Sequence, residues 1–296
     1  MARHLVFVHG RAQHGKDAVA LKKEWVISLE AGLAKSGLTL PIPDDQIRFP
    51  YYGDTLDQIV KGASAEDAVE IVVRGLPLSA DEQQFFEAYL AELKKVTGIS
   101  DADVDQALRS APLHRGPLNW EWVQAILAVL DQSVPFASGA GVALFTNDVF
   151  QYLHRKDLRT VMDNGVRSAF LPGSEAVVVS HSLGTVVAYN VLKNEPPQAD
   201  LHVPLFVTLG SPLAISAVKN KLQPVSHPTT VSQWFNAMDE RDVVSLYPLT
   251  SDHFAVFPPI ENLTTVDNFT ENHHGISGYL SDKEVARRIH AALIAP

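Results

Sequence analysis

Apolar residues fall into short unbroken runs, separated by longer segments in which they recur every three or four positions. Unbroken runs predict strands, and the recurring pattern predicts helices. The predicted strands are residues 5–8, 47–49, 176–179, 205–209, 231–235 and 263–266. The predicted helices between and after these strands are residues 17–35, 147–170 (one helix or a pair of helices), 186–192 and 283–294. Strands that alternate with helices in this way indicate an α/β fold, with a mostly parallel sheet covered by helices on both faces.

The block from residue 56 to 145 has a different pattern. Helical spacing dominates residues 81–96 and 120–130, prolines interrupt it, and no strong strand signal occurs. We therefore expect a core made of residues 1–55 and 146–296, with residues 56–145 inserted as a helical cap or lid. Packing explains the aromatic residues of this block more simply than a substrate pocket does; they are Phe85, Phe86, Tyr89, Trp120 and Trp122.

Composition narrows the possible functions. The chain has 296 residues, 46% of them hydrophobic, which is enough for a sizeable core. A formal net charge of -10 argues against a nucleic-acid partner. The absence of cysteine excludes disulfides and thiolate chemistry. No apolar run approaches the roughly 18 residues of a membrane span, so no integral membrane segment is expected. The N-terminus lacks a signal-peptide pattern, which predicts a cytoplasmic protein.

The most informative segment is Ser180-His181-Ser182-Leu183-Gly184, which follows a predicted strand and precedes a predicted helix. A sharp strand-to-helix turn with small residues on either side of a serine is the geometry of a nucleophile elbow. The usual form has glycine at both small positions, whereas this chain has serine at the first. The competing interpretation is an ordinary turn with a serine that caps the helix.

A serine nucleophile needs a histidine to accept its proton and an acid to orient that histidine. The acid candidates are Asp242 and Asp239, in a loop just beyond the strand at residues 231–235. The base candidates are His273 and His274, in a glycine-containing loop before the last helix. Only one of the adjacent histidines can serve, and we prefer His274.

The developing oxyanion needs backbone amides. The amide of Leu183, directly after the candidate nucleophile, is one candidate. The second is the amide of Arg11, in the loop that follows the first strand.

These motifs together resemble the α/β-hydrolase superfamily, in its lipase- and esterase-like branch. The segments that carry the resemblance are Phe7-Val8-His9-Gly10, the elbow, Leu209-Gly210-Ser211-Pro212-Leu213, the loop at Asp242 and the histidine loop that ends at Tyr279. The resemblance implies Ser182, Asp242 and His274 as the catalytic triad, in the chain order of that family. It also implies hydrolysis of carboxylic esters without a cofactor. It does not extend to residues 56–145, and the first two strands of the family would have to precede Met1.

Two other classes compete with this interpretation. Residues 10–17 match a phosphate-binding P-loop except at the last position, where Asp17 replaces the Ser or Thr that binds Mg²⁺. A non-catalytic binding protein on a hydrolase fold is the other alternative. A metal site is not expected, because His273 and His274 lack helical ligand spacing and no third ligand is evident. The partner that we expect is a small-molecule ester or acyl compound; its acyl chain, the choice among ester, thioester and amide, and the oligomeric state are not readable from the sequence.

Overall fold

A single parallel sheet organises the protein. The computed structural model describes residues 3–10, 17–51, 79–110, 120–135, 137–171, 173–195 and 201–295. Its described strands form one six-stranded sheet in the order β2-β1-β3-β4-β5-β6, and each neighbouring pair is parallel. The strands are β1 (Arg3–Val8), β2 (Ile47–Arg48), β3 (Glu175–His181), β4 (His202–Leu209), β5 (Val231–Ala237) and β6 (Glu261–Leu263). The prediction of an α/β fold with a parallel sheet is confirmed.

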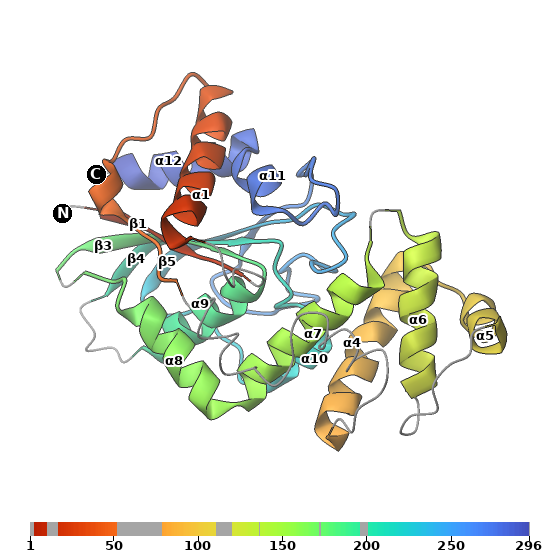
Figure 1. Cartoon of the computed structure of the whole chain (residues 1–296). Helices are drawn as coiled ribbons and strands as arrows, with labels where there is room; N and C mark the ends of the chain where they lie inside the picture. Colours follow the sequence, from red (N-terminus) through yellow and green to blue (C-terminus); the bar gives the residue numbers. More distant parts are fainter. Residues whose placement is uncertain are drawn as a thin grey trace.

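Helices cover both faces of this sheet (Figure 1). On one face lie α1 (Ala18–Ala34) and α12 (Lys283–Ile294), together with the short α11 (Ile276–Leu280). On the other lie α8 (Lys156–Arg167) and α9 (Leu183–Asn194). Alternate residues of β3 enter opposite cores: Val177 and Val179 pack on the α1 side, and Ala176 and Val178 pack on the α9 side. A central strand that is buried on both faces must be apolar at every position, which explains its unbroken hydrophobic run.

The described part of residues 56–145 is helical. It contains α4 (Ala80–Thr97), α5 (Asp101–Ser110), α6 (Trp120–Ser133) and the first part of α7 (Gly139–His154). These helices contact one another and lie to one side of the sheet (Figure 1). Helix α7 continues across residue 145 and contacts α8 and α9, so this block is joined to the sheet through a continuous helix.

The chain changes direction across the sheet between β1 and β3. From β1 it first adds β2 on one side, and it later returns to place β3 on the other side of β1. Such a reversal leaves a crevice at the carboxyl ends of the two flanking strands, where ligands bind in open α/β sheets. His9 and Gly10 follow β1, and Ser182 follows β3, so the candidate nucleophile lies at this crevice.

Most elements agree with the sequence pattern, with local differences. The helix or helix pair predicted for residues 147–170 is a pair, the end of α7 followed by α8. The last strand, predicted for residues 263–266, lies earlier in the chain, because β6 ends at Leu263. The pattern did not predict α5, α10 (Ser216–Lys221) or α11. Helices α10 and α11 are too short to show a helical period. In α5 only Val104 is buried, so the apolar pattern of this helix is weak. Over the described residues, none of the helices combines the length and apolarity needed to cross a membrane.

We expect opposite effects from the same substitution at two helical glycines. A Cβ at Gly32 in α1 would lie 2.5 Å from the Leu280 carbonyl oxygen and 2.7 Å from the Ala286 Cβ, so Gly32→Ala must separate α1 from its neighbours. Gly165 in α8 has open space around the same position. In chemical denaturation, Gly32→Ala should lower the free energy of unfolding by about 1–3 kcal/mol, whereas Gly165→Ala should raise it by about 0.5–1 kcal/mol. Equal effects at both sites would contradict this packing.

Candidate active site

Ser182 occupies the sharp turn between β3 and α9. Its backbone has φ 57 and ψ -131, a conformation that non-glycine residues rarely adopt. The Ser182 amide donates to the Leu209 carbonyl at 3.0 Å, and its carbonyl accepts from the Thr185 amide at 2.9 Å. These bonds hold the strained turn between a central strand and the helix, and the Ser182 side chain lines a cavity.

Close backbone approach explains the small residues around the turn. A Cβ at Gly184 would lie 2.3 Å from the Val8 carbonyl oxygen, and one at Gly10 would lie 2.7 Å from the Ser182 Cβ. Only glycine fits at these two positions. The departure at Ser180 also has a structural reason: this side chain is fully buried, and its hydroxyl donates to the Val207 carbonyl of β4 at 2.8 Å. The fold therefore accommodates serine at the first small position of the pentad.

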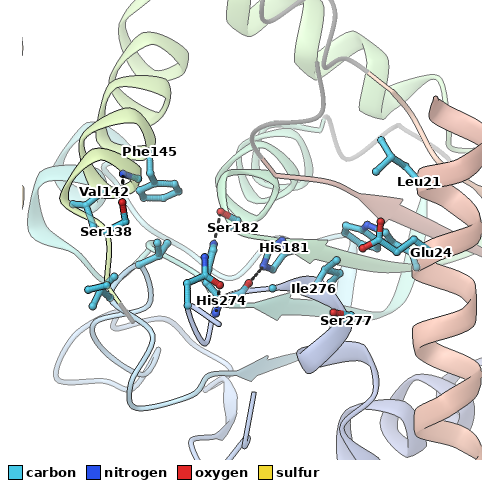
Figure 2. A pocket seen from close by; sticks show the side chains of 17 residues that line it. Leu21, Glu24, Ser138, Val142, Phe145, His181, Ser182, His274, Ile276 and Ser277 are labelled. Carbon is cyan, nitrogen blue, oxygen red and sulfur yellow. Dashed lines mark hydrogen bonds between the residues drawn. The ribbon is translucent and has the colours of Figure 1, made fainter. Parts of the chain in front are cut away.

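The structure brings Ser182, His274 and Asp242 together from three separate segments. His274 Nδ1 lies 2.7 Å from Asp242 Oδ2, and His274 Nε2 lies 2.8 Å from Ser182 Oγ. An ionised carboxylate can only accept, so Nδ1 is assigned the proton, and Nε2 is left with a lone pair directed at the serine hydroxyl. This arrangement can accept the proton of Ser182 (Figure 2).

Asp242 is fully enclosed, with a side chain that is 0% exposed. Its Oδ1 accepts from the Val244 amide at 2.9 Å, and its Oδ2 accepts from the Tyr279 hydroxyl at 2.6 Å as well as from His274. A buried carboxylate is costly unless hydrogen bonds replace its lost solvation, and these donors supply that replacement.

The competing acid and base have other partners. His273 has φ 53, and its Nδ1 donates to the Asn268 carbonyl at 2.8 Å. The Asp239 carboxylate accepts from the Arg241 guanidinium at 2.6 and 2.9 Å and from the Asn268 amide at 2.8 Å. Asp239 and His273 therefore fix the loops on which Asp242 and His274 stand, and neither contacts Ser182.

Sequence reasoning did not identify a role for His181, the residue before the candidate nucleophile. Its Nε2 donates to the His274 carbonyl at 2.7 Å, and the two imidazole rings are 4.7 Å apart. Burial lowers the pKa of His181 well below its ordinary value, and the neighbouring His274 lowers it further, so His181 is neutral. This bond attaches the loop of His274 to the end of β3. The signal in the sequence was a histidine directly before the candidate nucleophile.

A cavity of about 390 Å³ opens over Ser182 and His274, a size typical of small-molecule sites. Phe145, Val142 and Ser138 lie on one side of the serine–histidine pair, and Leu21 and Glu24 lie on the other (Figure 2). Other lining residues are Trp25, Ala137, Gly141, His181, Val243, Val244, Asn272, Gly275, Ile276 and Ser277.

The aromatic residues of the helical block have a mainly structural role, as the packing interpretation predicted. Phe85, Phe86 and Tyr89 are buried in the hydrophobic core. Trp122 is half-buried and packs against the same core, and the side chain of Trp120 lies outside the described residues. Among the described side chains of this block, the aromatic ring that reaches the cavity belongs to Phe145 and meets the His274 ring edge to face at 6.3 Å.

The two candidate oxyanion donors are described to different extents. Leu183 is the first residue of α9, so its amide has no intrahelical acceptor. Arg11 lies outside the described residues.

The other candidate sites are weaker. Residues 11–16 of the P-loop-like segment are outside the described part of the chain, but Asp17 is within it and caps α1, where its carboxylate accepts from the Val19 amide at 2.9 Å. A negative charge thus occupies the helix end at which a phosphate would bind. The described residues contain no cluster of histidine and carboxylate ligands that could hold a metal ion.

We expect His9, buried at the end of β1, to destabilise the protein in acid. Burial lowers its pKa from 6.5 to about 4. Between these pH values the unfolded chain takes up a proton at His9 that the folded chain does not. Stability is therefore lost as the pH falls through this window, by about 3 kcal/mol for this group.

Urea unfolding from neutral pH down to about pH 4 measures this effect. His9→Gln cannot titrate, so the variant should lack this part of the acid dependence. A variant that loses stability with falling pH as steeply as the wild type would contradict this role of His9.

Comparison of this chain with protein-family models, with curated proteins and with solved structures found no match.

Proposed function

We propose that the protein is a serine hydrolase that cleaves carboxylic esters through an acyl-enzyme, on an α/β-hydrolase fold. The observation that carries this proposal is the hydrogen-bonded series from Ser182 through His274 to Asp242. Support also comes from its location at the reversal point of a parallel sheet, beside a cavity of small-molecule size.

In the proposed first half-reaction, Ser182 Oγ forms a bond to the acyl carbon of the ester while His274 Nε2 accepts the hydroxyl proton. The carbonyl π electrons move onto the oxygen. When this pair returns, the bond to the leaving alcohol breaks, and His274 gives its proton to the departing oxygen. The acyl group is then attached to Ser182. In the second half-reaction a water molecule gives its proton to His274 and attacks the acyl carbon, after which His274 returns a proton to Ser182 and the acid is released.

Asp242 supports both half-reactions electrostatically. It accepts from His274 Nδ1 throughout, which keeps Nε2 directed at Ser182 and stabilises the imidazolium that forms. We assign the oxyanion to the amide of Leu183 at the N-terminus of α9, with the amide of Arg11 as the second donor.

We further propose that α4, α5, α6 and the start of α7 form a cap that limits what reaches the serine. The proposed cap lines the cavity through α7, where Val142 and Phe145 present apolar surface. Apolar walls beside a nucleophile suit the acyl chain of a small-molecule ester. Thioesters and amides share the acyl chemistry, and a series of p-nitrophenyl esters of increasing acyl length would rank the acyl groups that enter.

The test of the reaction is loss of activity on substitution of the nucleophile and the base. Hydrolysis of a p-nitrophenyl ester by Ser182→Ala and by His274→Ala should each fall by at least about 10³-fold in kcat, because these residues act as a unit. Ester hydrolysis that persists in Ser182→Ala at the wild-type rate would refute the proposal.

The adjacent histidine provides a matched control. His273 has a positive φ that asparagine tolerates, so His273→Asn preserves the backbone of the loop. We expect this variant to keep kcat within about tenfold of the wild type. If His273→Asn lost as much activity as His274→Ala, the assignment of the base would be wrong.

A further inference from the structure

Asp242 has a second partner on the oxygen that contacts His274. Its Oδ2 accepts from His274 Nδ1 at 2.7 Å and from the Tyr279 hydroxyl at 2.6 Å. The Tyr279 ring is fully buried, and Tyr279 does not line the cavity above Ser182. It therefore lies behind the acid, and its hydroxyl reaches the catalytic groups through Asp242.

Tyr279 is a permanent donor in this position. Burial raises its pKa well above the ordinary value, and the negative charge of Asp242 raises it further, so the phenol stays protonated at neutral pH. The Asp239 amide donates to the same hydroxyl at 3.2 Å. Because that amide occupies a lone pair of the phenol oxygen, the proton of the hydroxyl is left to point at Asp242 Oδ2.

Tyr279 also joins the loops that carry the acid and the base. It lies on α11, which begins just after His274, while Asp239 and Asp242 stand beyond β5. Gly210, which directly follows β4, faces Asp242, His274 and Tyr279: a Cβ there would lie 3.0 Å from Asp242 Oδ2, from His274 Nδ1 and from Tyr279 Cε2. Gly210 has a positive φ, and a side chain at this position would collide with these three residues. Only glycine therefore leaves space for their contacts.

We propose that Tyr279 is a positioning residue, which fixes the Asp242 carboxylate and sets how strongly that carboxylate holds the proton of His274. This inference rests on the proposed serine hydrolase. A charge-assisted hydrogen bond from Tyr279 offsets part of the negative charge on Oδ2. Without it, Oδ2 attracts the imidazolium more strongly, so His274 remains protonated to higher pH and cannot accept the proton of Ser182 there.

Other titratable groups also face the Asp242–His274 pair. They include His181 on β3 and Tyr89 on α4, and Glu24 on α1 lines the same cavity as His274. Removal of the Tyr279 hydroxyl takes an acceptor from the Asp239 amide, but the Asp239 carboxylate keeps its bonds to Arg241 and Asn268. His181 is neutral and Tyr89 is protonated near neutral pH, because burial disfavours the charged form of each. A change in the pH profile on removal of the Tyr279 hydroxyl therefore reports on its own bond.

The test compares Tyr279→Phe with Tyr152→Phe. Tyr152 is the matched control, since it is also fully buried and its hydroxyl donates to a carboxylate, Asp163, at 2.7 Å on the α7–α8 side of the fold. For ester hydrolysis by Tyr279→Phe, we expect the acid limb of the kcat/KM profile to move up by about one pH unit, with kcat roughly tenfold lower and KM unchanged. Tyr152→Phe should keep the wild-type profile. A Tyr279→Phe profile that coincides with the wild-type acid limb overturns the proposal.

NMR separates this proposal from the hydrolase assignment. The imidazole of His274 can be titrated in labelled protein without any substrate, and its titration midpoint should move upward in Tyr279→Phe and not in Tyr152→Phe. An unchanged midpoint overturns the role of Tyr279, even if ester hydrolysis is established. If Tyr279→Phe does not fold, the wild-type Tyr279 hydroxyl resonance provides the readout: it should shift with the midpoint of His274, and a resonance that is insensitive to that titration overturns the proposal.

Discussion

The backbone of the β3–α9 turn is the constraint on which the site depends. Ser182 stands at φ 57 and ψ -131, and such a conformation persists only where the surroundings enforce it. Strand β1 provides part of that enforcement, because the carbonyls of Val8 and His9 lie where a side chain at position 184 would be. The central strands, packed on both faces, thus hold the turn that presents the serine.

The parallel sheet brings the other groups of the site close to this turn. The carboxyl ends of β3, β4 and β5 meet at one edge, so the turn of Ser182, Gly210 and the loop of Asp242 become neighbours although they are far apart in the sequence. His274 then bridges the acid and the serine, and the His181 side chain donates a hydrogen bond to the carbonyl of His274. Each hydrogen bond in this series replaces solvation that burial has removed, so the polar groups support one another.

Much of this arrangement could be predicted from the sequence, because the strongest constraints are local. The strands are unbroken apolar runs since both faces are buried, and the small residues around Ser182 report a close backbone approach. The choice of His274 over His273 could only be a preference at that level. The structure distinguishes them through the positive φ of His273 and its bond to the Asn268 carbonyl, which no pattern of residues encodes.

Long-range contacts could not be predicted in the same way. The bond from Tyr279 to Asp242 joins a five-residue helix to a loop beyond β5, and α11 is too short to show periodicity. Likewise, Phe145 lines the cavity and the aromatic residues of α4 do not, because the packing of α4, α6 and α7 decides which way each side chain points. Residue types supplied the candidates, and packing decided which of them face Ser182.

Covalent labelling shows most directly whether Ser182 is an activated nucleophile. The folded protein would be treated with a fluorophosphonate, and the modified residue would be located by mass spectrometry. We expect a single adduct on Ser182 Oγ, formed much more slowly in His274→Ala. Absence of labelling under conditions that modify a known serine hydrolase, or an adduct on another residue, would contradict this role of Ser182.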